Sequence, residues 1–470
     1  MSAKSLHVSL ALAAAGWLSA CGATGFTHEE LQALSTARPA RSAAKPESAS
    51  VRTLARAVEL ALERNPSLAE ATARVRAAEA GLRQARAALW PMAGADLALT
   101  WAEAPSVYLF KSIDARSLAQ NTDFNDPGSL ENTELGLGAN WNLWRGGRDQ
   151  ATIDAAKFGV AAGVAAEDAQ RNALIGMVVA VWLDHRGARE LATSDEARVR
   201  MLERQLGDAR ARVASGSALD VDALAIEVRL AQAREARTRS QLAAKLALAA
   251  LRELLALEAE DELDPAPEAP APVSVAESLE AALALAHERR HELRAARAGL
   301  DAAQMRVRAA QATWKPRLDL QGRVWGDDNE VGLDFEEANS ALTLSLSFDV
   351  LDGGLRSAGR DAARAESMAA HARWRAAELA VQHDVDRAWL ALEGARARLE
   401  VAEQAVRAAE QGSELIAKLL ESGAATTSRY LDAESDLARA RAEHVLARID
   451  VQRAGFELLR ATGSLENVSW

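Results

Sequence analysis

The sequence contains the same module twice, which restricts the chain to folds built from two equivalent halves. Matches at an offset of 225 residues pair Leu60 with Leu285, Leu68 with Leu293 and Pro91 with Pro316; matches at an offset of 207 residues pair Gly146-Gly147 with Gly353-Gly354, Trp182 with Trp389 and Glu227 with Glu434. The offset changes once, so the copies differ substantially in length at one place, a loop between Trp101 and Trp141 of the first copy. We therefore predict one repeat over residues 51–263, a second over 275–463, a Pro-rich linker over 264–274 and a C-terminal tail over 464–470.

Each copy is expected to run helix, strand, loop, strand, long helix, tight turn, helix. Apolar residues recur with helical spacing at Leu174, Val178 and Val181-Trp182, and again at Val381, Val385 and Trp389. From Asp149 to Ser215 no proline interrupts this pattern, so a helix of about 100 Å is possible. Such a length predicts a coiled-coil-like array of helices, in which the two tryptophans pack in a seam.

Between the helices the spacing of the apolar residues changes from about 3.6 residues to 2 residues. This change predicts four strands at about 92–102, 133–144, 317–326 and 341–350. Apolar residues alternate with small or polar ones over about 10 residues, as in a membrane β-barrel with a wet lumen. A half-buried sheet of a soluble protein would show the same alternation. Aromatic residues at the strand ends favour the membrane, as an interfacial girdle. Its expected members are Trp101, Trp141, Trp144, Trp325 and Phe348.

Four strands cannot close a barrel by themselves. Unpaired backbone groups cost several kcal/mol each in lipid, so the sheet is expected to be completed by other subunits. The alternation allows eight, twelve or more strands. The predicted fold is thus mainly helical with a small β part, a long α-helical barrel that continues into a transmembrane β-barrel shared between subunits.

The N-terminus has the features of a bacterial export signal. Lys4 and His7 precede an apolar run that leads to Leu18-Ser19-Ala20-Cys21, too short to span a membrane. Leu-Ser-Ala-Cys looks like a lipobox, which predicts a signal peptide over residues 1–20 and a lipidated, palmitate-bearing linker over 21–50 that begins at Cys21. An ordinary signal peptide with a chance cysteine is the alternative. Gly22, rather than Asp, follows the cysteine, which favours the outer membrane.

Charge and motifs argue against an enzyme or a nucleic-acid partner. The net charge is −12, and the arginines alternate with acidic residues instead of clustering. His287-Glu288-Arg289-Arg290-His291 fits a zinc motif on a predicted helix, but the equivalent segment of the first copy, residues 62–66, contains no ligand. Since no phosphate-binding glycine loop or nucleophile motif occurs either, we expect no enzyme activity, no metal and no cofactor.

The duplicated helix–strand–strand–helix–helix module resembles the TolC family of outer-membrane channels. The most specific similarities are Ala61–Pro66, Trp141–Arg148 and the two turns that begin at Ser215-Gly216 and Ser422-Gly423. The resemblance implies a homotrimer with a twelve-stranded barrel and a twelve-helix periplasmic tunnel. It also implies a passive, gated conduit from periplasm to exterior, working with a periplasmic adaptor and an inner-membrane pump in tripartite efflux or type I secretion.

In this family the turns form the tunnel tip that docks the adaptor. The implied docking residues are Gly216, Leu219, Asp220, Asp222, Gly423, Thr426 and Arg429. The turn chemistry agrees, because glycine can end a helix in the left-handed conformation and Asp or Thr can cap the next one. The second turn has Arg429 where the first has Asp222, so a symmetric acidic contact is not expected. A periplasmic adaptor and a structural coiled-coil lipoprotein remain as alternatives, and the sequence does not identify the transported substrate.

Overall fold

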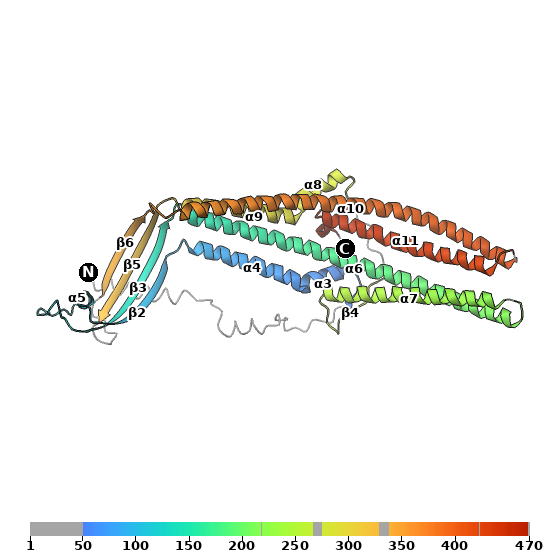
Figure 1. The fold of residues 1–470 in the computed structure, drawn as a ribbon, viewed down its shortest axis with the longest axis horizontal. Coiled ribbons are helices and arrows are strands. Elements are labelled where there is room, and N and C mark those ends of the chain that lie inside the picture. The colour runs from blue at the N-terminus through green and yellow to red at the C-terminus, as the bar shows by residue number, and fades with distance from the viewer. Residues whose placement is uncertain (1–49, 218, 267–274, 329–337, 423, 469–470) are drawn as a thin grey trace. The chain divides into compact units, whose positions relative to one another are not determined.

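The computed structural model describes residues 50–217, 219–266, 275–328, 338–422 and 424–468. Cys21, Gly423 and most of the Pro-rich linker lie outside the described residues. The chain divides into two units, residues 1–50 with 260–262 and residues 51–259 with 263–470. The second unit contains all the described helices and the four-stranded sheet (Figure 1).

The second unit is mainly helical, as predicted, with helices α3 (Leu54–Arg64), α4 (Pro66–Ala87), α5 (Pro105–Asp114), α6 (Arg148–Ala214), α7 (Asp220–Leu254), α8 (Leu279–Arg289), α9 (His291–Ala312), α10 (Leu355–Glu421) and α11 (Thr427–Ala461) and a 3₁₀ turn, η1 (Leu465–Asn467). Its sheet contains β2 (Met92–Ala102), β3 (Leu130–Trp144), β5 (Arg317–Asp328) and β6 (Asn339–Ser347), and two short strands, β1 (Ser50–Val51) and β4 (Glu262–Leu263), pair separately. The long helices α6 and α10 each have 67 residues, and α7 and α11 each have 35, so the duplication is preserved in three dimensions.

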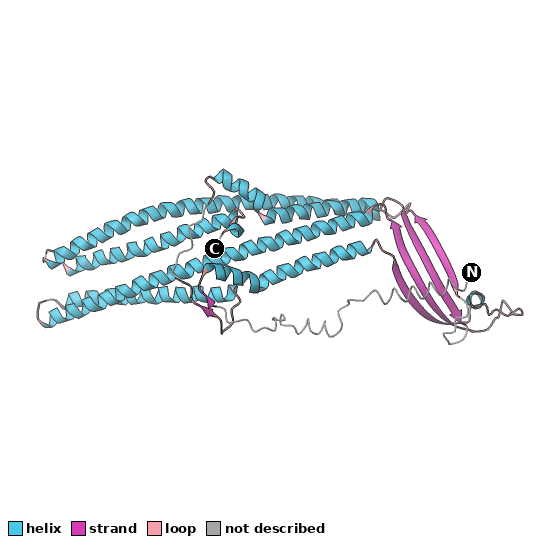
Figure 2. Cartoon of the chain, turned by 180° about the vertical axis from the view of Figure 1, so that it is seen from behind, coloured by secondary structure: helices cyan, strands magenta, loops and turns pink. Residues whose placement is uncertain are grey.

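Within this unit the helices lie side by side in a layer whose order changes along its length. Next to the sheet the order is α4-α6-α9-α10, and toward the two turns it is α7-α6-α11-α10 (Figures 1 and 2). The sheet lies at one end of α6 and α10, and the α6–α7 and α10–α11 turns lie at the other. None of the described helices is both long enough and apolar enough to be a candidate membrane span.

The first helix of each copy is broken in two, which the periodicity did not predict. Asn65 is extended (φ −67°, ψ 125°) because Pro66 disfavours a helical conformation at the residue before it. Its side-chain amide donates to the Leu254 carbonyl at the end of α7 (2.8 Å). Arg290 is extended in the same way (φ −64°, ψ 119°) and donates to the Ala461 carbonyl at the end of α11 (3.0 Å). In both copies the side chain at the break thus donates to one of the carbonyls at the C-terminus of α7 or α11 that have no hydrogen-bond partner within the helix.

Narrow apolar seams hold the helices together. One cluster joins α8, α10 and α11 through Ala282, Val385 and Leu458, and another joins α6 and α7 to α11 through Leu202, Ile226 and Leu431. Trp182 is only 2% exposed, and Trp389 packs against the first cluster, so both tryptophans are packing residues as predicted.

A helix that was not predicted, α5, lies in the longer loop of the first copy. Pro105 occupies the first turn of α5, where its missing N–H leaves no hydrogen bond unmade. Only 10 residues long, α5 is too short for helical periodicity to stand out in the sequence.

Candidate functional site

The sheet has the strand order β2-β3-β5-β6, all antiparallel, and its register separates apolar from polar residues. Residues that pair directly share a face, as Leu97 does with Leu135 and Leu320 with Leu344. The apolar face contains Leu97, Leu99, Trp101, Leu135, Leu137, Trp141, Leu318, Leu320, Val324, Leu342, Leu344 and Leu346. The polar face contains Asp96, Asn132, Glu134, Asn140, Asp319, Gln321, Arg323, Asp327, Asn339, Thr343 and Ser345.

The apolar face is uncovered. Leu99 is 70% exposed, Leu342 77% and Leu346 71%. A contiguous apolar surface built from four strands is larger than soluble monomers usually tolerate in water. Together with an opposite polar face, it is the arrangement expected of barrel strands that face lipid on one side and a wet lumen on the other.

Three of the five expected girdle residues lie on the apolar face. Trp101 is at the end of the sheet far from the long helices, and Trp141 is near the helices, where its indole donates to the Leu89 carbonyl (3.0 Å). Trp144 pairs with Leu318 across a register shift, so a β-bulge turns it to the same face as Trp141.

The other two expected girdle residues, Trp325 and Phe348, do not lie on the apolar face. Trp325 pairs with Gly136 and Asn339 and therefore lies on the polar face, with the Arg323 guanidinium 5.6 Å from its ring; it does not belong to a lipid-facing girdle. The strand expected to reach residue 350 ends at Ser347, so Phe348 follows the sheet and lies 5.9 Å from the Arg356 guanidinium.

A charged network on the polar face was not predicted. Lys111 of α5 forms ion pairs with Glu134 and, at 2.9 Å, with Asp327, whose side chain is fully buried. Arg323 bridges Glu134 (2.5 Å) and Asp96 (2.8 Å) across the strands. Alternation alone cannot reveal such a network, because the partners come from different strands and from α5.

Both edges of the second unit are open in the part of the chain that the structure describes. β2 and β6 are edge strands, and α10 lies at the edge of the helical layer on the β6 side. An exposed apolar stripe follows α10 at intervals of 11 residues: Met368 (74%), Leu379 (64%), Leu390 (65%) and Val401 (65%). Eleven residues are close to three helical turns, so the stripe is nearly straight. At the opposite edge α7 carries a similar exposed stripe, namely Leu224, Val228, Leu242 and Leu246.

The first turn has the expected glycine conformation but a different cap. Gly216 is left-handed (φ +73°), as predicted. The residue at the N-cap of α7 is Leu219, which makes no side-chain cap, while Asp220 and Asp222 lie in the first helical turn. Their carboxylates therefore stabilise the helix dipole and do not cap it, in contrast to the predicted role. In the second turn Thr426 does cap α11, accepting from the Arg429 N–H (3.3 Å).

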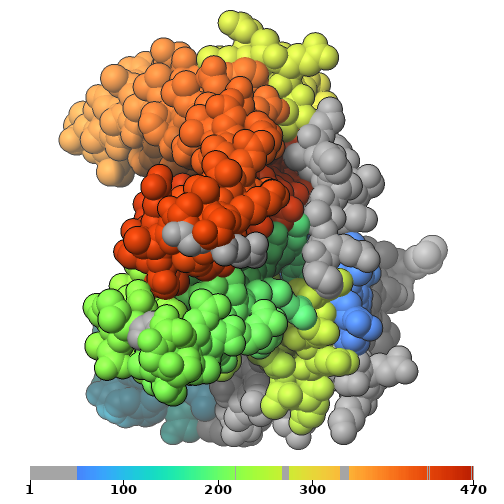
Figure 3. Space-filling model, turned by 90° about the vertical axis from the view of Figure 1, so that its right-hand side faces the viewer, coloured from blue at the N-terminus to red at the C-terminus, as the bar shows by residue number. Residues whose placement is uncertain are grey.

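Near the turns, the two hairpins are linked by contacts that sequence analysis missed. Gln205 of α6 donates to the Tyr430 hydroxyl (3.1 Å), and Arg229 of α7 pairs with Asp432 (2.7 Å). Between these links Leu431 is buried against α6 and α7, and burial also raises the pKa of the Tyr430 hydroxyl. Figure 3, which views the molecule from the end with the turns, shows the red α11 segment against the green hairpin of α6 and α7.

The zinc motif is not on one continuous helix, contrary to the prediction. His287 is in the last turn of α8, His291 begins α9, and the extended Arg290 separates them. His291 instead accepts a hydrogen bond from Arg294 (2.8 Å) and lies near Asp168 and Glu466. Among the described residues no group of three potential metal ligands occurs.

Comparisons with known proteins match this architecture. The model of the family described as outer membrane efflux protein matches residues 57–257 and 282–464, which correspond to the two copies. The chain is 27% identical over 415 residues to protein CyaE of Bordetella pertussis, covering 88% of this chain and 84% of that one. It is 26% identical over 289 residues to outer membrane efflux protein BepC of Brucella suis, covering 61% and 62%. A crystal structure of a membrane protein from Pseudomonas aeruginosa superposes with a TM-score of 0.78 at 24% identity, covering 87% and 90%.

Proposed function

Because the chain belongs to the outer membrane efflux protein family and is an outer-membrane efflux channel, we propose that it works as a passive, gated conduit from periplasm to exterior in a tripartite efflux or type I secretion system. The observation that carries this proposal is the sheet, which is apolar on one face, polar on the other and open at both edges. Neither a periplasmic adaptor nor a structural coiled coil requires a sheet of this kind.

The open edges support a ring of identical subunits. Lipid does not tolerate unpaired strand edges, so β6 of one subunit pairs with β2 of the next. The part of the α10 stripe next to the sheet then lies beside α4 of the same neighbour, and only the part toward the turns lies beside the exposed stripe on α7. This contact joins two different surfaces, one from each subunit. Such a head-to-tail contact closes into a ring when the rotation from one subunit to the next divides a full turn evenly. We expect the three subunits that the family resemblance implies.

The contacts between the hairpins support a gate near the turns. We propose that the Gln205–Tyr430 and Arg229–Asp432 links hold the closed arrangement. A hydrogen bond and a partly exposed ion pair together contribute about 1–2 kcal/mol. Removing both, with Tyr430→Phe and Arg229→Ala, should therefore shift the open-to-closed ratio about tenfold per subunit and raise single-channel conductance in planar bilayers.

Arg210→Ala is the matched control for this experiment. Arg210 pairs with Glu227, which joins α6 to α7 within the same hairpin, so its loss should leave the conductance unchanged. Equal conductance of the double variant and the unmodified channel would contradict a gate at these links, while a protein that never conducts would contradict the channel itself.

The turn of the first hairpin is proposed as the main docking surface for the periplasmic adaptor. Leu219 and Val221 are 70% and 62% exposed there, beside Asp220 and Asp222. The described part of the second turn, with Thr426 and Arg429, is more polar. We predict that Leu219→Arg strongly weakens co-purification with the adaptor and that Arg429→Ala weakens it less. Equal retention in both variants would contradict docking on the first hairpin.

We also propose that Cys21 carries lipid and anchors the mature chain in the outer membrane. Cys21→Ala should abolish incorporation of radiolabelled palmitate and leave a longer, unprocessed chain on gels. Palmitate labelling that persists in this variant would refute the assignment, because the chain has no other cysteine.

The family consists of transport components and not of enzymes. We propose that the channel itself catalyses no reaction and that the partner pump supplies the energy.

A further inference from the structure

Helix α5 lies across the polar face of the sheet. Lys111 reaches Glu134 on β3 and Asp327 on β5, and the Asn339 amide on β6 donates to the Asp114 carbonyl at the end of α5 (3.0 Å). The strand register places all three of these sheet residues on the polar face. The helix is therefore attached to three positions on one face, at the end of the sheet far from the long helices.

The charges of this attachment are largely withdrawn from water. The Asp327 side chain is 0% exposed and that of Glu134 10%, while Lys111 retains 24%. A carboxylate buried to this degree is costly without a cationic partner, so the sheet favours the position of α5 that brings Lys111 to it.

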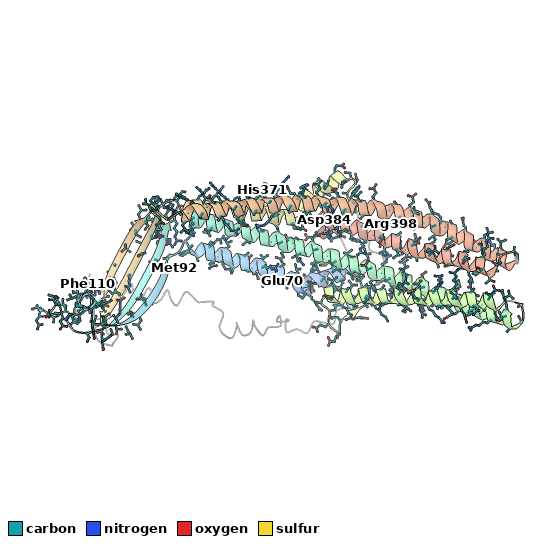
Figure 4. The ribbon with its side chains drawn as sticks, in the orientation of Figure 1. Glu70, Met92, Phe110, His371, Asp384 and Arg398 are labelled. Atoms are coloured by element: carbon teal, nitrogen blue, oxygen red, sulfur yellow. The ribbon has the colours of Figure 1, made fainter. Side chains whose placement is uncertain are left out.

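The opposite side of α5 is apolar and uncovered. Phe110 is 70% exposed and Ile113 51%, and with Ser106 they follow the i, i+4, i+7 spacing of one helix face. Figure 4 shows Phe110 at the end of the sheet opposite Met92. The Phe110 and Ile113 side chains are thus exposed on the side of α5 that faces away from the polar face of the sheet.

We propose that α5 narrows the outer mouth of the channel by contacting the α5 helices of the other subunits through Phe110 and Ile113. This inference rests on the proposed closure of the sheet with its polar face inward. In such a barrel every α5 lies inside the mouth and directs its apolar face toward the common axis. The equivalent helix of a second copy is then the apolar surface within reach, and contact between the copies removes both faces from water.

Cysteine cross-linking tests the contact. In full-length, detergent-purified protein, Phe110→Cys treated with a short bis-maleimide should give a covalent dimer. Leu99→Cys is the matched control, since Leu99 lies on the apolar face of β2, and the parent chain with Cys21 alone gives the background. Conducting oligomers in which Phe110→Cys cross-links no more than Leu99→Cys would overturn the inference. If the parent protein neither oligomerises nor conducts, the proposed function fails instead.

Conductance tests the constriction itself. Phe110→Ala removes an exposed ring and leaves the Lys111 ion pairs intact, so folding should be preserved. Combined with Tyr430→Phe and Arg229→Ala, which remove the hairpin links, it should raise the conductance above that of the double variant alone. An unchanged conductance would overturn the role of α5 in limiting the mouth.

Discussion

Replacing Leu344 by arginine should prevent stable insertion of the sheet into the membrane, whereas replacing its neighbour Thr343 should be tolerated. Leu344 is 62% exposed on the apolar face and pairs with Leu320. An arginine on the lipid side of a barrel strand costs about 2–4 kcal/mol near the midplane, and every subunit of the ring bears this cost. Thr343 pairs with Gln321 on the polar face, where an arginine stays hydrated.

The two variants differ by one position in the same edge strand, so differences in expression or strand propensity largely cancel. The measurement is the fraction of protein that resists urea extraction from outer membranes, together with the oligomer band on semi-native gels. Equal loss of Leu344→Arg and Thr343→Arg from the membrane would mean that lipid does not cover the apolar face.

Replacing Arg290 by alanine should lower the free energy of unfolding by about 2–3 kcal/mol, the range for losing hydrogen bonds made by a buried charged group. The Arg290 side chain is 4% exposed, and its guanidinium contacts Glu292 (2.8 Å), Asp384 (3.4 Å) and the Ala461 carbonyl (3.0 Å). Its loss leaves the end of α11 without this donor and both carboxylates without this cation. Asn65→Ala, at the equivalent position, removes a neutral hydrogen bond and should cost about 1–3 kcal/mol.

Arg74→Ala serves as the control, because Arg74 is 76% exposed and, within the described part of the chain, pairs with Glu70 on its own helix. Its cost should stay below about 1 kcal/mol. Urea denaturation in detergent, followed by helical circular dichroism, measures all three. If Arg290→Ala is as stable as Arg74→Ala, the helix break does not depend on the Arg290 network.

Much of the fold could be predicted because it repeats. The long helices carry their apolar spacing over many turns, so α6 and α10 were evident from the sequence. Alternation also located the four strands, because a sheet with two different faces needs it along every strand. The channel function followed from the duplicated module and its resemblance to a known family.

Other features depend on partners that are distant in the sequence. The helix break at Asn65 could have been inferred from Pro66, but the break at Arg290 has no proline to indicate it and is stabilised by contacts to α10 and α11. Trp325 seemed a girdle residue because of its place near a strand end, but the strand register turns it to the polar face. Asp220 and Asp222 do not cap α7 because Leu219 is its N-cap residue and both aspartates lie in its first turn.

The sequence by itself determined the duplication, the lengths of the long helices and the presence of an amphipathic sheet, since these are periodic properties of continuous segments. Only the tertiary structure decided that α5 lies on the polar face, that the two hairpins are linked at Tyr430 and Asp432, and which edges stay open. The physical reason is that ion pairs, buried side chains and strand register join residues that can lie more than 200 positions apart. No local pattern records which of many polar side chains will meet.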